Sequence, residues 1–357
     1  MKSGKNHQNL KTMKPVGVIG AGSFGSAIAN LIAYNKDVLL FSRKPDLVCQ
    51  INESHFHPEL NIQMSPRIKA TDDLQYIAEQ CTLLFPIVPS DSFRSMMRNL
   101  SPFLHPYHFL IHGTKGFDLR DINIDQLDDV KLTREHLCTM SEIIREESVV
   151  VRVGCLSGPN LAREIFDGQP TATVIGSKFD EVIEAGKSAL NSKHFQVFGT
   201  YELLGAELAG ALKNMIAIGA GILAGLNMGK NIQSLLITRG LMEMIYFGKA
   251  MGTSPKAFVG TAGIGDLVCT ATSEDSRNFT FGKRLGRGES PEQIRATMPE
   301  LAEGVRTVKI AKHLADYFGL HVPITQMLYR VVYEGFEIEK GIEFLMRYPY
   351  YVDVDFL

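Results

Sequence analysis

The sequence lacks any regular arrangement of cysteine, since its five cysteines are scattered and none forms a C-x-x-C pair. Neither a zinc site nor a disulfide framework is therefore indicated, and we expect free thiols in a reducing cytosol. The sequence also lacks an excess of charge of one sign. Its formal net charge of −2 argues against a general nucleic-acid binder. It contains no P-loop, no H-E-x-x-H motif and no nucleophile elbow with a Ser-His-Asp order.

The first residues lack the apolar core of a signal peptide, which predicts a cytoplasmic protein. Residues 1–13 are polar and are expected to be a disordered extension, with Met13 a candidate natural start. The most apolar segment, residues 203–228, carries Lys213 in its interior, which favours a buried core helix over a membrane span. The length of 357 residues, with 45% hydrophobic and 21% charged residues, predicts a globular protein of two domains.

What the sequence does contain is a short apolar run, Val16–Ile19, that ends in GAGSFG (residues 20–25) and continues into a helical pattern. Strand, glycine turn and helix in this order are typical of dinucleotide binding. Gly20 permits the tight bend, Gly22 lets a pyrophosphate approach, and Gly25 lets the helix pack on its strand. The helix N-terminus then faces the phosphates. The alternative is a glycine-rich turn without a ligand.

A second strand, expected at residues 37–42, is followed by Arg43 and Lys44. A fold that binds NAD usually has an acid here, about 20 residues past the glycines. Two cations suit a 2′-phosphate instead, so NADP should be accepted and is a candidate for the preferred cofactor. The alternative is that both side chains belong to a solvated loop. His55 and His57 are spaced like metal ligands, but no carboxylate pattern completes a site, and we expect loop histidines.

Apolar strands then alternate with helical patterns, which predicts an α/β fold with a doubly wound, mostly parallel sheet. Ligands bind at the carboxyl ends of such strands. Lys115 of HGTKG follows the strand Phe109–His112 and is expected where cofactor and substrate meet, the alternative being a surface lysine. The polar residues 118–147, with a helix over 133–146, are expected at one edge of the sheet. Further strands are expected at residues 83–88, 149–156, 171–176 and 195–199, and helices at 71–79 and 161–166.

From residue 201 the strand signals nearly end and helical patterns predominate. We therefore expect a Rossmann domain over residues 14–200 and an all-helical domain over residues 201–357, with the boundary near Thr200. The aromatic C-terminus, YPYYVDVDFL, is expected to pack down or to pair with a neighbour. Helices are expected at residues 202–226, 234–251, 291–296, 305–318 and 323–334, a glycine-punctuated turn at 255–266 and a polar loop at 270–276.

Lys213 lies among small and apolar residues of the first of these helices. Burial disfavours the charged amine and lowers its pKa, as a general acid/base near neutrality requires. The amine would exchange a proton with a carbonyl or alcohol oxygen while hydride moves at carbon; the alternative is a side chain that extends to the surface. Asp266 is suited to orient this amine or to bind a substrate hydroxyl. Nearby, Arg277 is suited to bidentate phosphate recognition, with Asn278 as a further donor.

Taken together, these motifs resemble the NAD(P)-dependent glycerol-3-phosphate dehydrogenases. The resemblance implies a Rossmann domain, an all-helical C-terminal domain, a homodimer, and NADP or NAD as cofactor. It also implies the reversible reduction of dihydroxyacetone phosphate to sn-glycerol 3-phosphate for glycerophospholipid synthesis. The matching strings, in the order of the family, are GAGSFG (20–25), VPS (88–90), HGTKG (112–116), LSGPNLARE (156–164), ELAGALKNMIAIGAGI (207–222), TRGLMEM (238–244), GTAGIGDLVCT (260–270), SRN (276–278) and AEGVRT (302–307).

The resemblance also implies residue roles, with Lys213 as the proton donor and acceptor. Two matches depart from the pattern: Asn160 stands where bacterial members often have Thr, and Phe24 where Trp or Tyr is frequent. The segment between HGTKG and SGPN is also longer than usual. The cofactor would be contacted by Gly20, Gly22, Ser23, Phe24, Gly25, Arg43, Lys115, Ala162, Arg277, Leu301 and Glu303. The substrate would be contacted by Lys115, Gly158, Asn160, Lys213, Asp266, Ser276, Arg277 and Asn278.

Two other functions stay open at this point. A related two-domain hydroxyacid dehydrogenase would bind a carboxylate substrate and would not require the DSRN sequence at residues 275–278. A non-catalytic dinucleotide sensor would keep the glycine loop but would have no need of Lys213.

Overall fold

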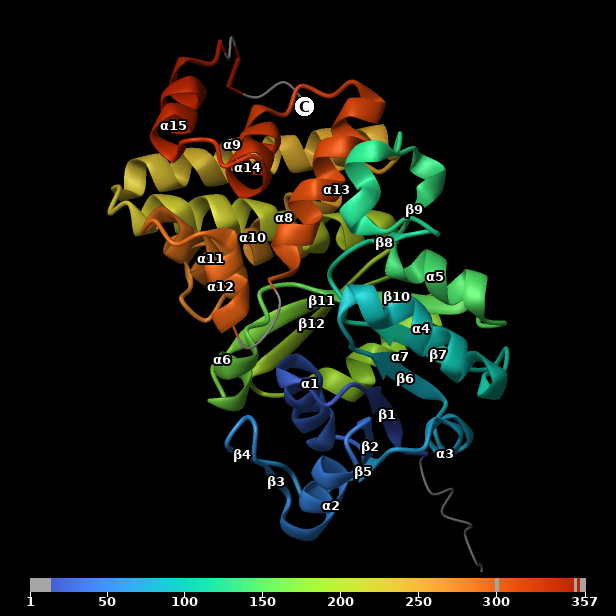
Figure 1. The fold of residues 1–357 in the computed structure, drawn as a ribbon. Helices are drawn as coiled ribbons and strands as arrows, with labels where there is room; N and C mark the ends of the chain where they lie inside the picture. The colour runs from blue at the N-terminus through green and yellow to red at the C-terminus, as the bar shows by residue number, and fades with distance from the viewer. Residues whose placement is uncertain (1–13, 299–301, 350–351, 354–357) are drawn as a thin grey trace, which may run out of the picture.

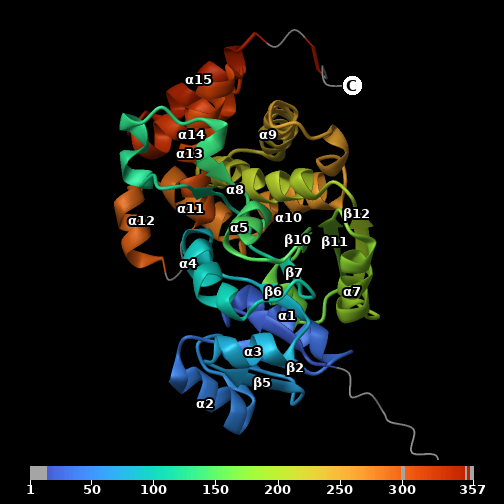
Figure 2. The same ribbon diagram turned by 90° about the vertical axis from the view of Figure 1, so that its right-hand side faces the viewer.

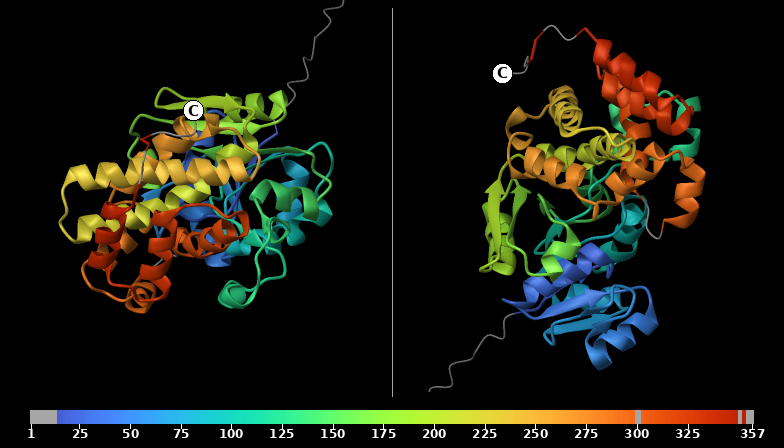
Figure 3. Two further views of the ribbon diagram at one scale, coloured as in Figure 1. Left: turned by 90° about the horizontal axis from the view of Figure 1, so that it is seen from above. Right: turned by 90° about the vertical axis from the view of Figure 1, so that its left-hand side faces the viewer.

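The computed structural model describes residues 14–298, 302–349 and 352–353, so the expected extension at residues 1–13 and most of the C-terminal aromatic segment lie outside the described residues. Within them, a sheet domain occupies the lower half of Figure 1 and a group of helices the upper half. Figure 3 shows the same two halves from two further directions. The α/β plan expected from the sequence is therefore confirmed.

The main sheet has eight strands in the described residues, in the order β12-β11-β10-β7-β6-β1-β2-β5. Neighbouring strands run parallel except β10 and β11, which are antiparallel. β1 pairs with β2 and β6 inside the sheet, so all four of its residues are buried. The strands are β1 Val16–Ile19, β2 Val38–Phe41, β5 Ile68–Thr71, β6 Leu83–Pro86, β7 Phe109–His112, β10 Arg152–Ser157, β11 Thr171–Ser177 and β12 Phe195–Thr200.

Helices cover both faces of this sheet, which makes it doubly wound. One apolar core contains side chains of α1, α2 and α7, and the other contains side chains of α3, α4 and α5. The strand expected at 149–156 begins only at Arg152, because Val149 and Val151 are exposed. These helices, with the short α6, are α1 Ser23–Ala33, α2 Pro45–Ser54, α3 Leu74–Gln80, α4 Ser90–Leu100, α5 Met140–Glu147, α6 Ala162–Phe166 and α7 Asp180–Leu190. Two small hairpins accompany the sheet, β3 Phe56–His57 with β4 Ile62–Gln63 and β8 Asp118–Leu119 with β9 Leu137–Cys138.

The second half of the chain is built around α8, Leu203–Gly225, which lies between the sheet domain and α9 (Figure 2). By length and composition α8 is able to span a membrane, but 94% of its most apolar window is buried inside the protein. This is the core helix expected from the sequence. The other helices are α9 Lys230–Ala250, α10 Asp266–Thr272, α11 Arg277–Gly286, α12 Pro291–Thr297, α13 Glu303–Phe318, α14 Pro323–Tyr333 and α15 Ile338–Arg347.

Two glycines of α8, Gly221 and Gly225, are explained by the close approach of α11. A Cβ atom at Gly221 would lie 2.0 Å from the backbone oxygen of Phe279, and one at Gly282 of α11 would lie 2.0 Å from that of Ile218. Two helices with these glycines can bring their backbones into contact, which larger residues would prevent. The close contact fixes α11, and with it the SRN sequence at its start, against α8.

Two expectations for this half are wrong in detail. Residues 270–276 are not a polar loop throughout, because α10 continues to Thr272. Residues 255–266 are not only a turn, since they include a π-helical turn, Thr261–Gly265, that leads directly into α10. A π-helical turn has no distinct sequence signature, and such turns are frequent at functional sites.

The segment between β7 and α5 also differs from the expectation. Only Met140–Glu147 is α-helical, and the residues before it form short 3₁₀ turns and the β8–β9 hairpin. The segment does not merely lie at one edge of the sheet. Its buried apolar side chains belong to the core of the helical domain, and Figure 1 shows it beside α13. These side chains are Phe117, Leu119, Leu127, Leu132 and Leu137.

We call residues 117–138 the strap. Polar contacts also attach this segment to the helical domain. The carboxylate of Asp128 accepts a hydrogen bond from the Tyr329 hydroxyl at 2.7 Å and lies 2.6 Å from Lys309 Nζ and 2.9 Å from His313 Nε2. The strap thus leaves the sheet domain just after Lys115, is held on α13 and α14, and returns to the sheet domain at α5.

We predict that Leu127→Ala destabilises the protein by about 2–5 kcal/mol, because Leu127 is completely buried in the core of the helical domain. Val130→Ala is the matched control, since Val130 belongs to the same strap but is exposed. The free energies of unfolding are measured by urea denaturation. Equal effects of the two substitutions would contradict the attachment of the strap.

Candidate active site

The carboxylate of Asp266 joins two lysines from different parts of the chain. Asp266 is the first residue of α10 and is 1% exposed. Its Oδ1 lies 2.8 Å from Nζ of Lys213 on α8, and its Oδ2 lies 2.6 Å from Nζ of Lys115, which follows β7. The three residues therefore meet where the sheet domain touches the helical domain.

Burial sets the proton affinities of this group. It lowers the pKa of Lys213 to about 8, although the nearby Asp266 favours the charged amine. Burial alone would raise the pKa of Asp266, but Lys115 and Lys213 together hold it below its usual value. Asp266 is therefore ionised at neutral pH, whereas Lys213 titrates close to neutrality. Lys213 is 5% exposed, so it does not extend to the surface.

Thr270 completes the surroundings of the Lys213 amine. Its hydroxyl accepts a hydrogen bond from Lys213 Nζ and donates one to Asp266 Oδ1 at 3.2 Å. A lysine ammonium has three N–H donors in a flexible arrangement. Asp266 and Thr270 take two of them, so a third donor is directed elsewhere. This arrangement suits an amine that hydrogen-bonds an oxygen atom of a small ligand.

Lys115 is held by one backbone carbonyl and by the side chain of Asn214. Its Nζ donates to the Gly158 carbonyl at 3.0 Å, and its own carbonyl accepts from Asn214 Nδ2 at 3.4 Å. Gly210 of α8 packs beside this lysine: a Cβ there would make an ordinary contact with Lys115 Cγ at 3.5 Å and a tight one with Ser157 Oγ at 3.1 Å. Gly158 adopts φ = +151°, a backbone conformation that favours glycine.

The SRN sequence lies at the start of α11. Ser276 caps the helix, since its Oγ accepts from Phe279 N at 3.2 Å. Asn278 donates to Asn214 Oδ1 at 3.0 Å and accepts from Gly304 N at 2.8 Å, so it connects α8, α11 and α13. Arg277 is exposed in the first turn of this ten-residue helix. A helix N-terminus with an arginine provides N–H donors and positive charge for an anion.

A further contact joins the two halves of the protein at Glu303, the first residue of α13. Its Oε1 accepts from Ser90 N at 3.0 Å, and its Oε2 accepts from Ser90 Oγ at 2.6 Å. Ser90 is the last residue of the VPS sequence and the first of α4, so its N–H points out of a helix N-terminus. VPS is among the strings that resemble the family, but no role was expected for Ser90.

Asn160 is attached to the neighbouring strand. Its Nδ2 donates to the Ala172 carbonyl at 3.1 Å, and its Oδ1 accepts from Thr173 Oγ1 at 2.8 Å. Both polar atoms of the side chain therefore hold the loop after β10 against β11. Ala162 is the first residue of α6, immediately beyond this loop.

The glycine loop has the close contacts of a dinucleotide-binding turn. Gly20 has φ = +119°, and a Cβ there would lie 2.0 Å from the Ile87 carbonyl. A Cβ at Gly25 would lie 1.9 Å from the Gly20 carbonyl, so the helix packs closely on its strand. Gly22 has no atom within 4 Å of its Cβ position and is open. The loop therefore fits a pyrophosphate at Gly22 and at the N-terminus of α1.

Ser23 and Phe24 begin α1 directly after this loop. The ring of Phe24 lies next to Gly113, because a Cβ at Gly113 would be 3.1 Å from Phe24 Cε1. Gly113 precedes Lys115 by two residues. The structure therefore brings the glycine loop, the HGTKG sequence and, through Lys115, the Asp266 group into one region. Leu301 lies outside the described residues.

The two cations after β2 differ in their surroundings. Arg43 and Lys44 are both exposed, and Lys44 forms an ion pair with Glu59. Glu59 offsets part of the positive charge at this place. The expectation of loop histidines is wrong for His57, which belongs to β3 and is 1% exposed. Among the described residues, no cluster of three His, Cys, Asp or Glu side chains has metal-binding geometry.

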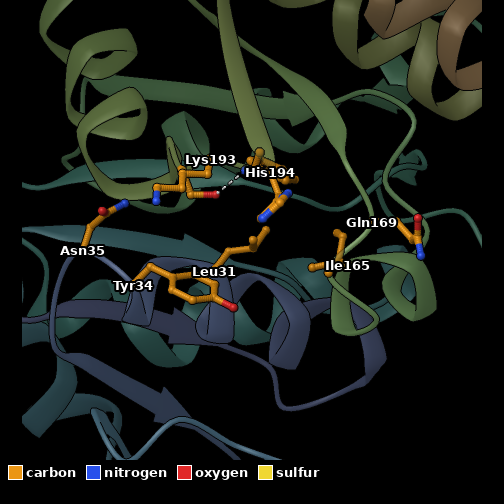
Figure 4. A pocket seen from close by; sticks show the side chains of 10 residues that line it. Leu31, Tyr34, Asn35, Ile165, Gln169, Lys193 and His194 are labelled. Carbon is orange, nitrogen blue, oxygen red and sulfur yellow. Dashed lines mark hydrogen bonds between the residues drawn. The ribbon is translucent and has the colours of Figure 1, made fainter.

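A cavity of about 500 Å³ lies at the C-terminal end of α1, the end opposite the glycine loop (Figure 4). Leu31 and Tyr34, near the C-terminal end of α1, face Ile165, Lys193 and His194 across it. None of the site residues expected from the sequence lines this cavity.

The fold and the site define a two-domain, dinucleotide-binding oxidoreductase. Residues 15–183 match the model of the N-terminal domain of NAD-dependent glycerol-3-phosphate dehydrogenase, and residues 202–343 match that of its C-terminal domain. A glycerol-3-phosphate dehydrogenase [NAD(P)+] of Ectopseudomonas mendocina is 38% identical over 351 residues, 98% of each chain. One from Pseudomonas aeruginosa PAO1 is 37% identical, again over 98% of each chain.

Among solved structures, the glycerol-3-phosphate dehydrogenase of Coxiella burnetii superposes with a TM-score of 0.84 at 28% identity, covering 94% of this chain and 99% of that one. A ketopantoate reductase of Ralstonia eutropha shares the fold at 14% identity with a TM-score of 0.55, over 89% and 97% of the two chains. The chain therefore belongs to the NAD-dependent glycerol-3-phosphate dehydrogenase family.

The pKa of Lys213 leads to a prediction about stability. The folded chain releases the Lys213 proton near pH 8, whereas an unfolded lysine keeps it to its ordinary value of 10.5. The unfolded state thus binds more protons between these values, so the stability of the folded state rises with pH there. We predict that the free energy of unfolding of the natural chain, minus that of Lys213→Met, increases from about pH 8 to about pH 10.

The matched control is Lys178→Met, since Lys178 is exposed and its replacement should leave the difference constant over the same range. Urea denaturation at several pH values measures both differences. A difference for Lys213→Met that does not change with pH would contradict the lowered pKa.

Proposed function

We propose that this protein catalyses the reversible reduction of dihydroxyacetone phosphate to sn-glycerol 3-phosphate with NADPH or NADH, which supplies the backbone of glycerophospholipids. The observation that carries the proposal is the Lys213–Asp266–Lys115 group at the junction of the two domains. It combines a buried amine that titrates near neutrality with a fixed carboxylate and a second cation.

Lys213 is the proposed proton donor and acceptor. As the ammonium form it hydrogen-bonds the ketone oxygen of the substrate and gives up a proton as that oxygen becomes an alcohol. Its pKa of about 8 is close to the operating pH, so both protonation states are accessible. Asp266 and Thr270 orient the amine through their contacts with Nζ. Asp266 also favours the charged form and keeps the amine protonated for reduction.

The substrate phosphate is proposed to lie at the N-terminus of α11. Arg277 provides two parallel N–H donors there, and Ser276 and Asn278 add polar groups on either side. Support comes from the hydrogen bonds that Asn278 makes with α8 and α13, which fix the start of α11 next to Asn214, the neighbour of Lys213. Lys115, Gly158 and Asn160 are proposed to bound the substrate on the side of the sheet domain.

The cofactor is proposed to bind along the glycine loop, where it supplies or receives the hydride. Gly20, Gly22 and Gly25 shape the loop, and Ser23 and the ring of Phe24 line it. Arg43 is proposed at the adenosine end, where Lys44 and Glu59 nearly cancel in charge; this pairing supports acceptance of both NADP and NAD. Further contacts are proposed for Lys115, Ala162, Arg277, Leu301 and Glu303.

We further propose the domain division of residues 14–200 and 201–357, with residues 1–13 as an extension. The end of β12 at Thr200 and the start of α8 at Leu203 support this division. A homodimer in the cytoplasm is proposed as well. Exposed apolar side chains on two helices of the helical domain, Leu235 on α9 and Phe344 and Met346 on α15, support a self-association surface there.

The experiment that tests this function follows the oxidation of NADPH and of NADH in the presence of dihydroxyacetone phosphate or of 2-keto acids. We predict turnover with the phosphorylated ketone and at least about a hundredfold lower kcat/KM with 2-keto acids, because these leave the phosphate-binding groups unpaired. A higher kcat/KM with a 2-keto acid would identify a hydroxyacid dehydrogenase. Cofactor binding without turnover would identify a sensor.

Lys213→Ala is predicted to lower kcat by about 10²–10⁴-fold, because the proton of the substrate oxygen then has no positioned acid. The dissociation constant of NADPH should stay nearly unchanged, since Lys213 has no contact with the glycine loop. Lys178→Ala, at an exposed position, is the control. Unchanged turnover of Lys213→Ala would contradict the acid/base role.

A further inference from the structure

A buried histidine contacts the glycine loop from the β3–β4 hairpin. His57 is 1% exposed, and its Nε2 lies 2.9 Å from the carbonyl oxygen of Ala21, the residue between Gly20 and Gly22. A carbonyl oxygen only accepts hydrogen bonds, so Nε2 carries the proton and donates. His57 Nδ1 is buried and has no hydrogen-bond partner among the described residues. The imidazole therefore makes its contact with the loop through Nε2.

The hairpin that carries His57 is fixed in turn by α1, the helix that begins at the glycine loop. Asn30 of α1 accepts a hydrogen bond from Ser65 N at 2.9 Å, immediately after the hairpin. Met64 N donates to the His55 carbonyl at 2.6 Å and closes the base of the hairpin. The base of the hairpin that carries His57 is thus fixed by one hydrogen bond to α1 and one within the hairpin.

The contact determines the direction of one peptide group. The peptide bond between Ala21 and Gly22 is trans, so the Ala21 carbonyl and the Gly22 N–H point in opposite directions. His57 holds the Ala21 carbonyl on the side that faces the hairpin. The Gly22 N–H therefore points away from the hairpin. Gly22 is also exposed and open at its Cβ position. The Gly22 N–H is therefore available to an anion. The Ala21 carbonyl oxygen, which would repel an anion, faces the opposite direction.

We propose that His57 is a positioning residue for the cofactor: its Nε2–H holds the Ala21 carbonyl so that the Gly22 N–H is directed at the pyrophosphate of NAD(P)H. The proposal rests on the proposed function in one respect, namely that this loop binds the pyrophosphate. It gives His57 no contact with the substrate and no part in the proton transfer. His57 should therefore influence cofactor affinity while kcat at saturating cofactor stays the same.

The test compares three replacements of His57 by the dissociation constant of NADPH, measured from the fluorescence of the bound dinucleotide. Gln places its amide nitrogen about where histidine has Nε2, so His57→Gln should bind NADPH within about twofold of the natural chain. Asn ends about where histidine has Nδ1, and Leu has no donor. His57→Asn and His57→Leu should each weaken NADPH binding about tenfold, as expected for an unpaired carbonyl and a misdirected N–H.

Two further measurements separate positioning from general damage. The KM for dihydroxyacetone phosphate and kcat, at saturating NADPH, should be unchanged in all three variants. Gln63→Leu is the matched control, because Gln63 lies on the other strand of the same hairpin and its side chain donates to the Ser54 carbonyl at 3.0 Å. It should leave NADPH binding unchanged even where it lowers the thermal stability.

The outcomes are distinct. Rescue by Gln with loss in Asn and Leu supports the proposal. Unchanged NADPH binding in His57→Asn, or a loss in His57→Gln as large as in His57→Asn, overturns it, as does an equal loss in Gln63→Leu. Because Asn is polar and smaller than histidine, this comparison holds even where His57→Leu does not fold. If the natural chain itself does not bind NADPH, the proposed function fails, and that result is separate from any ranking of the variants.

Discussion

The carboxylate of Asp266, shared between Lys115 and Lys213, is the interaction on which the rest of the site depends. A buried lysine such as Lys213 is costly unless a negative charge lies next to it, and a second, partly exposed ammonium group nearby adds to the cost. One carboxylate with an oxygen for each amine makes the arrangement stable. Lys115 belongs to the sheet domain and Lys213 to the helical domain. Their shared contact with Asp266 therefore also joins the two domains, at the place where a ligand that touches both domains would bind.

The remaining structure holds these three side chains in place. Glycines of α8 and α11 allow the two helices to touch, which fixes the SRN sequence beside Lys213. The strap carries the chain from Lys115 to α13 and α14 and so ties the loop of that lysine to the helical domain. At the start of α13, Glu303 binds the N-terminus of α4. Separate contacts thus oppose any movement of one domain relative to the other.

Much of this was predictable from the sequence. The strand–glycine–helix order of Val16–Gly25 depends on local sterics, and Lys213 in an apolar helix indicated a buried amine from its neighbours alone. What could not be predicted depends on contacts between distant residues. Ser90 and Glu303 are separated by 213 positions. The strap contains a few leucines among polar residues. This distribution of apolar residues does not indicate which of the two domains the leucines pack into. His57 resembled a loop histidine because nothing in its neighbourhood indicates Ala21 as a partner.

The most direct test of this account is the pKa of the Lys213 side chain, measured by NMR on protein with labelled lysine and assigned by the loss of its signal in Lys213→Met. The account predicts a titration near pH 8 in the natural chain, moving to lower pH in Asp266→Asn because the negative charge that favours the ammonium is removed. A titration near 10.5, the ordinary value of a lysine, or one that is the same in Asp266→Asn, would contradict it.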